Sequence, residues 1–202
     1  MVKGTVTKNM ESIGTHYEVC IEGKKLYDAD VPSALTVQHI YCKKGDEFVY
    51  TIVYDATMGL KNAAREKQDQ QNDLYNIVNF RNKNIGYICE RTDFALLRAT
   101  YWIEMRYGNV MYKGYVINTK EGLKVTVFDT EKQEQVALAE RTGNDYELFG
   151  ISEIATKVVS IMVVVGEVKT KHNYGWISFD PTLTTKNKKL LDKYDPKFKN
   201  RI

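Results

Sequence analysis

The stretch SEIATKVVSIMVVVGEVK, residues 152–169, limits the possible folds of this chain more than any other segment. Its most apolar part runs only from Val158 to Val165. A membrane-spanning helix needs about 20 apolar residues, so this stretch is too short to cross a bilayer. We therefore expect it inside the protein, as a buried strand or as a helix that the rest of the chain encloses.

The start of this stretch favours a helix. Ser152 stands where an N-cap would stand, Glu153 suits the positive end of the helix dipole, and Gly166 offers an end. A helix over residues 153–165 would be apolar on nearly every side, and such a helix must be enclosed. One side would carry Ile154, Val158, Ile161, Met162 and Val165, and the other Val159, Val163 and Val164. A strand buried on both faces remains the alternative.

The first 55 residues have the alternation of apolar and polar side chains that is typical of strands with one wet face. Tyr17, Val19 and Ile21 share a face in HYEVCIEG, and KKLYDADV supplies a partner strand. Two longer runs, ALTVQHIYCK and DEFVYTIVYDA, are separated by KGD, a connection of hairpin length. This region predicts four or five strands, and whether they join the strands that follow stays open.

Residues 56–73, ATMGLKNAAREKQDQQND, interrupt the strand pattern. They are rich in Ala, Lys, Glu and Gln and contain almost no β-branched residue. We expect a surface helix or a linker here.

Further hairpins follow from residue 74. The first hairpin is LYNIVNFRNKNIGYICERT, with its turn at RNKN, and the second is ATYWIEMRYGNVMYKGYVINT, with its turn at GN. A third hairpin turns at KEG, and a last pair of strands lies in TEKQEQVALAERTGNDYELFGI. Turns at such regular spacing indicate a sandwich or a barrel. We predict a mainly β fold with one or two helices, whose antiparallel hairpins form a barrel or sandwich around the hydrophobic helix near the C-terminus. Residues 1–183 would form a single domain, and 184–202 a basic tail.

This order of elements resembles the tubby-like C-terminal superfamily, which includes tubby proteins, LURP-one-related proteins and phospholipid scramblases. The resembling segments are YNIVNFRNKNIGYICER and YWIEMRYGNVMYKGYVI, followed by DYELFGISEIATKVVSIMVVVGEV, within residues 74–169. The resemblance implies a closed β-barrel around a hydrophobic helix, and it makes a lipid headgroup a candidate ligand.

Charge and cysteine content exclude several classes of protein. The 29 Lys and Arg against 26 Asp and Glu give a net charge of +3, too balanced for a general nucleic-acid binder. Cys20, Cys42 and Cys89 have unrelated spacings, which favours reduced, buried thiols over a metal site. The N-terminus has no apolar core typical of a signal peptide. We expect a cytoplasmic protein without a cofactor or metal.

Few residues suggest catalysis. Asp28 and Asp30 would share a face on a strand, as an acid/base pair or a cation site requires, but we favour DADVPS as a strand end that turns at Pro32. The histidines, His16, His39 and His172, lie in no known catalytic motif. The run YWIEMRYGNVMY could stack on single-stranded nucleic acid, although such alternation is more typical of packing between strands.

Basic residues concentrate in the C-terminal tail, and they are the candidate residues for binding a lipid or a partner. They are Lys186, Lys188, Lys189, Lys193, Lys197, Lys199 and Arg201. Apolar residues alternate with them, so the tail could lie on an anionic membrane or on an acidic protein surface. A solvated tail with a short docked helix is the simpler alternative.

We favour a non-enzymatic β-barrel binding module that engages a lipid headgroup, an anionic membrane surface or a protein partner. One alternative is a lipocalin-like carrier of a small apolar ligand, in which the apolar stretch 152–169 would form part of the barrel wall. Another is an enzyme whose site assembles only in three dimensions, from Asp28, Asp30 and one histidine.

Overall fold

The computed structural model describes residues 1–11, 14–32, 39–55, 74–95, 98–119, 122–170 and 191–201. The predicted helix or linker at 56–73, His172, and the tail residues Lys186, Lys188 and Lys189 lie outside the described residues.

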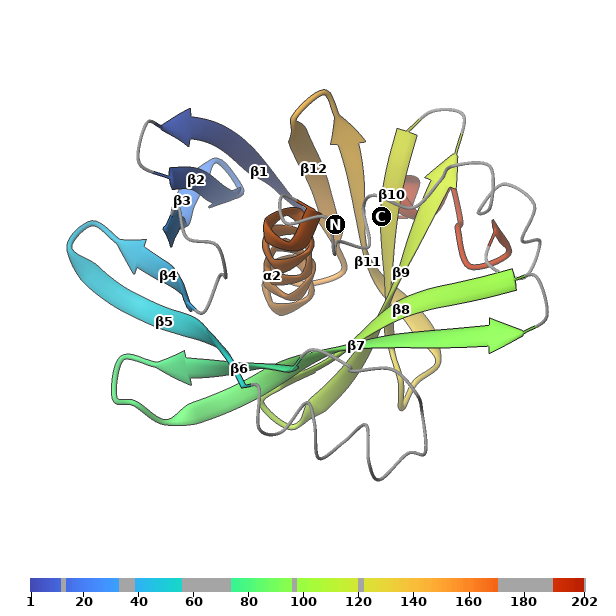
Figure 1. Cartoon of the computed structure of the whole chain (residues 1–202). Helices are drawn as coiled ribbons and strands as arrows, with labels where there is room; N and C mark the ends of the chain where they lie inside the picture. Colours follow the sequence, from blue (N-terminus) through green and yellow to red (C-terminus); the bar gives the residue numbers. More distant parts are fainter. Residues whose placement is uncertain are drawn as a thin grey trace.

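The strands form one closed antiparallel barrel (Figure 1). Each strand pairs with the next along the chain, and β1 pairs with β12 to close the ring. The barrel contains the first 55 residues as well as the later hairpins, so the question of their membership is settled. The strands are β1 (Val2–Glu11), β2 (Gly14–Ile21), β3 (Lys24–Pro32), β4 (His39–Lys44), β5 (Glu47–Tyr54), β6 (Leu74–Asn79), β7 (Asn84–Ala95), β8 (Arg98–Tyr107), β9 (Val110–Thr119), β10 (Gly122–Asp129), β11 (Glu134–Thr142) and β12 (Asp145–Gly150).

Alternation in the sequence decides which side chains enter the barrel. Tyr17, Val19 and Ile21 of β2 are buried, as predicted, while the residues between them lie on the outer face. Two of the predicted turns contain a glycine in the left-handed region, Gly45 and Gly108, each with φ of 61°. That conformation favours glycine, so these residues fix where the β4–β5 and β8–β9 hairpins reverse.

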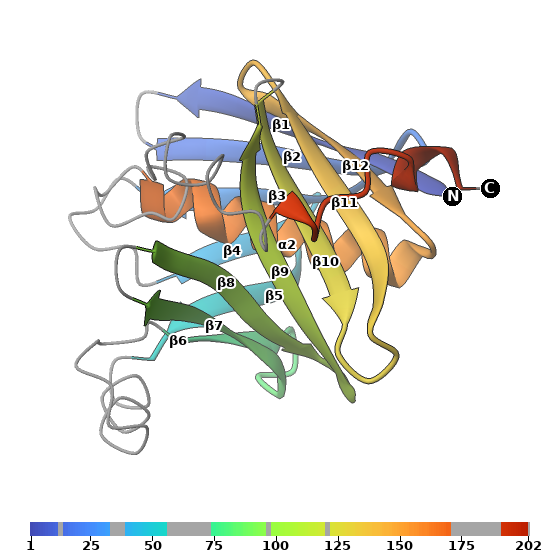
Figure 2. The same cartoon turned by 90° about the vertical axis from the view of Figure 1, so that its right-hand side faces the viewer.

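The apolar stretch is a helix, α2 (Glu153–Thr170), and it lies inside the barrel (Figures 1 and 2). The Ser152 hydroxyl accepts a hydrogen bond from the Ala155 N–H at 3.2 Å, so the predicted N-cap is confirmed and the strand alternative is wrong. The helix packs mainly against β1, β2, β11 and β12. Its buried apolar residues are Ala155, Val158, Val159, Ile161, Met162, Val163, Val164 and Val165.

Two details of the predicted helix were wrong. Ile154 was assigned to the buried side, but 57% of its surface is exposed because it precedes the enclosed turns. The helix also continues through Gly166, where an end was predicted. A glycine inside a helix costs about 1 kcal/mol relative to alanine, and contacts made by the following turn, above all at Glu167, offset that cost.

A glycine on the barrel wall allows the helix to approach closely. A Cβ atom at Gly114 of β9 would lie 2.7 Å from the Met162 sulfur. The absence of a side chain there leaves room for Met162, so α2 and β9 fit together at that position.

The C-terminal segment, residues 191–201, lies against the outside of the barrel (Figure 2). It ends in a short 3₁₀ helix, η2 (Phe198–Asn200), and Phe198 is fully buried against Leu138 and Phe149. Met1 packs against the same cluster, which brings the two ends of the chain together. Full burial of one such aromatic side chain contributes about 1.5–3 kcal/mol, which is enough to hold a short segment in place.

Among the helices in the described ranges, none combines the length and the apolar character that crossing a membrane would require.

Candidate functional site

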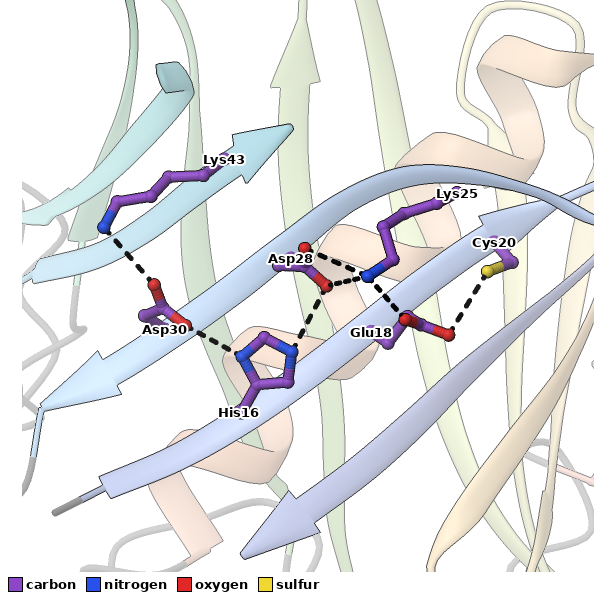
Figure 3. A network of polar contacts seen from close by, with 7 residues as sticks. All are labelled: His16, Glu18, Cys20, Lys25, Asp28, Asp30 and Lys43. Atoms are coloured by element: carbon purple, nitrogen blue, oxygen red, sulfur yellow. Dashed lines mark hydrogen bonds and ion pairs between the residues drawn. The ribbon is translucent and has the colours of Figure 1, made fainter. Parts of the chain in front are cut away.

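A cluster of charged and polar side chains lies on the outer face of β2, β3 and β4 (Figure 3). We call it the His16 network; its members are His16, Glu18, Cys20, Lys25, Asp28, Asp30 and Lys43. Alternate residues of a strand point to the same side, so His16 and Glu18 on β2 face outward with Asp28 and Asp30 on β3. His16 pairs directly with Asp30 in the strand register.

His16 lies between two carboxylates. Its Nδ1 is 2.8 Å from Oδ1 of Asp30, and its Nε2 is 3.2 Å from Oδ1 of Asp28. A neutral imidazole carries one N–H, so only the imidazolium form can donate to both carboxylates. Lys43 of β4 extends the network, with its Nζ 3.4 Å from the other oxygen of Asp30.

Lys25 joins the remaining carboxylates. Its Nζ lies 2.6 Å from Oε2 of Glu18 and 3.1 Å from Oδ1 of Asp28. The hydrogen bonds to Glu18 and Asp28 raise the pKa of Lys25 above its usual value, and the hydrogen bond from Lys25 lowers the pKa of Glu18. Burial and the neighbouring Glu18 carboxylate both raise the pKa of the Cys20 thiol.

This geometry suits an ion-pair network better than a catalytic centre. Both nitrogens of His16 are engaged by carboxylates, which leaves neither free to act on a substrate. A thiol with a raised pKa, such as that of Cys20, is a poor nucleophile. The described residues contain no group of three or more His, Cys, Asp or Glu side chains arranged to hold a metal ion.

The structure therefore brings Asp28, Asp30 and one histidine together, as the hypothesis of a dispersed enzyme site required. The segment DADVPS was predicted as a strand end that turns at Pro32. Strand β3 contains Asp28 and Asp30 and ends at Pro32, and the residues directly after it lie outside the described ones. Proline is tolerated at a strand end, and the ion pairs to His16 and Lys25 offset the low strand propensity of aspartate. His39 takes no part in the network and stacks on Tyr41 at 5.8 Å.

None of the three cysteines forms a disulfide, as predicted. Cys42 and Cys89 are buried, while Cys20 is half-buried on the outer face.

Four of the seven candidate tail residues lie in the C-terminal segment. Lys199 forms an ion pair with Glu140 at 2.9 Å, and Arg201 forms one with Asp195. Lys197 is exposed. Lys193 lies over two aromatic rings of the barrel wall, with its Nζ 5.8 Å from the centre of Tyr115 and 5.6 Å from that of Phe128.

Those rings belong to an outer strip that we name the aromatic–lysine strip, made of Trp102, Lys113, Tyr115, Phe128 and Lys193. Lys113 lies 4.3 Å from the Trp102 ring and 5.6 Å from the Tyr115 ring. Burial lowers the pKa of Lys113, and its carboxylate neighbour Glu104 opposes this shift. The strip thus places two cations among three partly covered aromatic rings, and an ammonium over an aromatic face is stabilised by about 0.5–1 kcal/mol.

Sequence reasoning identified Lys193 but missed the rest of the strip. The strand register was the signal that could have found it, since Trp102 pairs with Tyr115 and Lys113 pairs with Phe128 across β8, β9 and β10. In the run YWIEMRYGNVMY, Ile103 and Met105 are buried, which agrees with core packing on one face.

No protein-family model, curated protein or solved structure matches this chain.

Proposed function

We propose that this protein is a non-enzymatic binding module of tubby-like type that binds anionic membrane surfaces through its outer wall. The observation that carries the proposal is the position of α2. An apolar helix inside the barrel takes up space that a carrier would give to an apolar ligand, so partners are left with the outer surface. The closed barrel around a helix also supports the resemblance to the tubby-like superfamily.

The aromatic–lysine strip and the C-terminal segment are the part of that surface with suitable chemistry. Trp and Tyr side chains favour the membrane interface, where their rings meet the headgroups. Lysines attract anionic lipids, and each cation near such a surface contributes about 1 kcal/mol. Lys193 and Lys197 are the candidates for this role, because Lys199 is paired with Glu140 of β11 and Arg201 with Asp195 of the segment itself.

Vesicle binding tests the proposal. The wild-type protein should sediment with vesicles of phosphatidylcholine and phosphatidylserine, and not with phosphatidylcholine alone, and added salt should weaken the binding. The double variant Lys193→Gln/Lys197→Gln loses two cations, so we expect about thirtyfold weaker binding.

The matched control is Lys44→Gln/Lys132→Gln, which removes two exposed lysines elsewhere on the barrel, one at the end of β4 and one in the turn before β11. Equal binding by the wild type and the Lys193→Gln/Lys197→Gln variant would refute the role of the strip. Equal binding to neutral and anionic vesicles would refute the proposal as a whole.

A further inference from the structure

One lysine of α2 lies inside the barrel. Lys157 is half-buried between the buried residues Thr156 and Val158. Its ammonium is 5.2 Å from the centre of the Tyr50 ring on β5 and 5.6 Å from that of the Tyr107 ring, where β8 ends. The helix starts just after β12 ends, so Lys157 lies near the end of the barrel at which β8 and β12 finish.

Two charged side chains of α2, those of Lys157 and Glu167, differ in their partners. Glu167, in the last turns of the helix, accepts hydrogen bonds from Lys8 and Tyr146, each at 2.7 Å. The ammonium of Lys157 forms no ion pair or hydrogen bond with any residue that the structure describes, and its contacts are with aromatic rings. Charges removed from water are normally paired, because leaving one unpaired costs free energy. Among the described residues, the ammonium of Lys157 therefore has no counter-ion, whereas Glu167 has one.

A second group beside Lys157 has no hydrogen bond of ordinary geometry with the described residues. It is the buried Tyr50 hydroxyl; burial raises its pKa, and the nearby Cys42 thiol and Tyr27 hydroxyl add to the rise. Its neighbour Tyr27, whose ring lies 5.2 Å away, satisfies its own hydroxyl with Ser160 at 2.9 Å. A buried hydroxyl without a partner costs about 1–3 kcal/mol. Because burial raises the pKa of Tyr50 well above its usual value, the phenol keeps its proton and remains a donor.

We propose that Lys157 and Tyr50 form a binding site for a small oxyanion, a carboxylate or a phosphate, inside this end of the barrel. An oxyanion supplies the negative charge that the ammonium lacks and an acceptor for the phenol proton. A cation would be repelled by Lys157. The half-buried position of Lys157 allows the anion to enter from solvent. This site is separate from the outer aromatic–lysine strip, so it does not depend on the proposed membrane binding.

Calorimetric titration with sodium phosphate and with sodium butyrate, against sodium chloride at equal ionic strength, tests the site. We expect the wild-type protein to bind at least one of the two oxyanions at millimolar concentration. Lys157→Met should bind it about tenfold more weakly, because it loses the only ionic contact with the ligand. Lys157→Arg keeps the charge and should retain most of the affinity.

The variant Tyr50→Phe separates a binding role from a structural one. Removing an unsatisfied hydroxyl should leave the ligand-free protein as stable as the wild type or more stable, while oxyanion binding weakens. Lys44→Met, which removes an exposed lysine, is the matched control and should bind within a factor of about two of the wild type.

A further titration with glycerol 3-phosphate identifies the source of a bound phosphate. Tighter binding than inorganic phosphate supports a site for a phosphate ester, and weaker binding supports one for the free anion. Oxyanion binding that is undetectable in the wild type, or unchanged in Lys157→Met, would overturn the proposal.

Discussion

At the scale of single residues, hydrogen-bond donors surround the buried carboxylate of Glu167 and stabilise its charge. The Glu167 side chain is 3% exposed, and its carboxylate accepts from Lys8 of β1 and from Tyr146 of β12. Arg141 of β11 lies 3.9 Å away. These contacts join the last turns of α2 to three neighbouring strands, including the pair that closes the ring. Glu167 therefore fixes the helix beside the β1–β12 pair that closes the barrel.

Replacement of Glu167 by glutamine should destabilise the protein strongly. The amide keeps the shape of the side chain but removes the negative charge that Lys8 needs, and breaking one side of a buried ion pair costs about 3 kcal/mol. Urea denaturation measures this loss as a lower free energy of unfolding. The exposed Glu47 gives the control, since Glu47→Gln should change stability by less than about 0.5 kcal/mol. Equal effects of the two variants would contradict the anchoring role of Glu167.

At the scale of elements, one carboxylate of the barrel wall adds to the burial of Phe198 in holding the C-terminal segment. Glu140 of β11 accepts from Lys199 at 2.9 Å and from the Tyr194 hydroxyl at 3.1 Å, and Lys124 of β10 lies 3.2 Å away. Burial alone would raise the pKa of Glu140, but the hydrogen bonds from Lys199 and Lys124 outweigh it and lower the pKa. The docked segment thus favours the ionised form of Glu140.

Docking of this segment should therefore weaken in acid. With a lowered pKa in the docked state, the stabilisation is fully present above the usual range of a glutamate, about pH 4, and is lost as the pH falls through the lowered value. The NMR signals of residues 194–200 should move toward unfolded positions over that interval. Glu140→Gln should remove the acid dependence and weaken docking at neutral pH. An identical pH response in the wild type and the variant would contradict this assignment.

Local elements could be predicted from the sequence because their signals are local. Alternation marked the strands, and Ser152 together with the apolar run marked the helix. The seam between β1 and β12 could not be predicted, since it pairs Val2 with Gly150 across almost the whole chain. A short docked helix in the tail was one of the predictions, but its contact could not be predicted, because Phe198 stands among charges in the sequence and meets Leu138 only in the fold.

In the candidate sites too, local spacing could be predicted from the sequence, whereas contacts between distant residues could not. The spacing of Asp28 and Asp30 was visible, but the position of His16 between them depends on the register of β2 against β3. Lys157 appears in the sequence as an ordinary helix residue. Its significance comes from Tyr50 and Tyr107, which the barrel brings to it from two distant strands.

At the scale of the whole molecule, the barrel is both closed by the pairing of β1 with β12 and filled by α2. Pairing β1 with β12 leaves no unpaired edge strand between them, and exposed edges are sites of aggregation. Enclosing α2 buries a helix that is apolar on nearly all sides and could not remain in water. A molecule built in this way presents its outer wall and the ends of its barrel to partners, and both binding proposals rest on that arrangement.

Amide hydrogen exchange across residues 155–165 tests this arrangement most directly. A helix enclosed by a closed barrel can exchange only when the barrel opens, so its amides should be as slow as the slowest amides of β11 and β12 and should follow the global free energy of unfolding. Exchange in α2 that is much faster than in those strands, and independent of global unfolding, would show that the barrel does not enclose the helix.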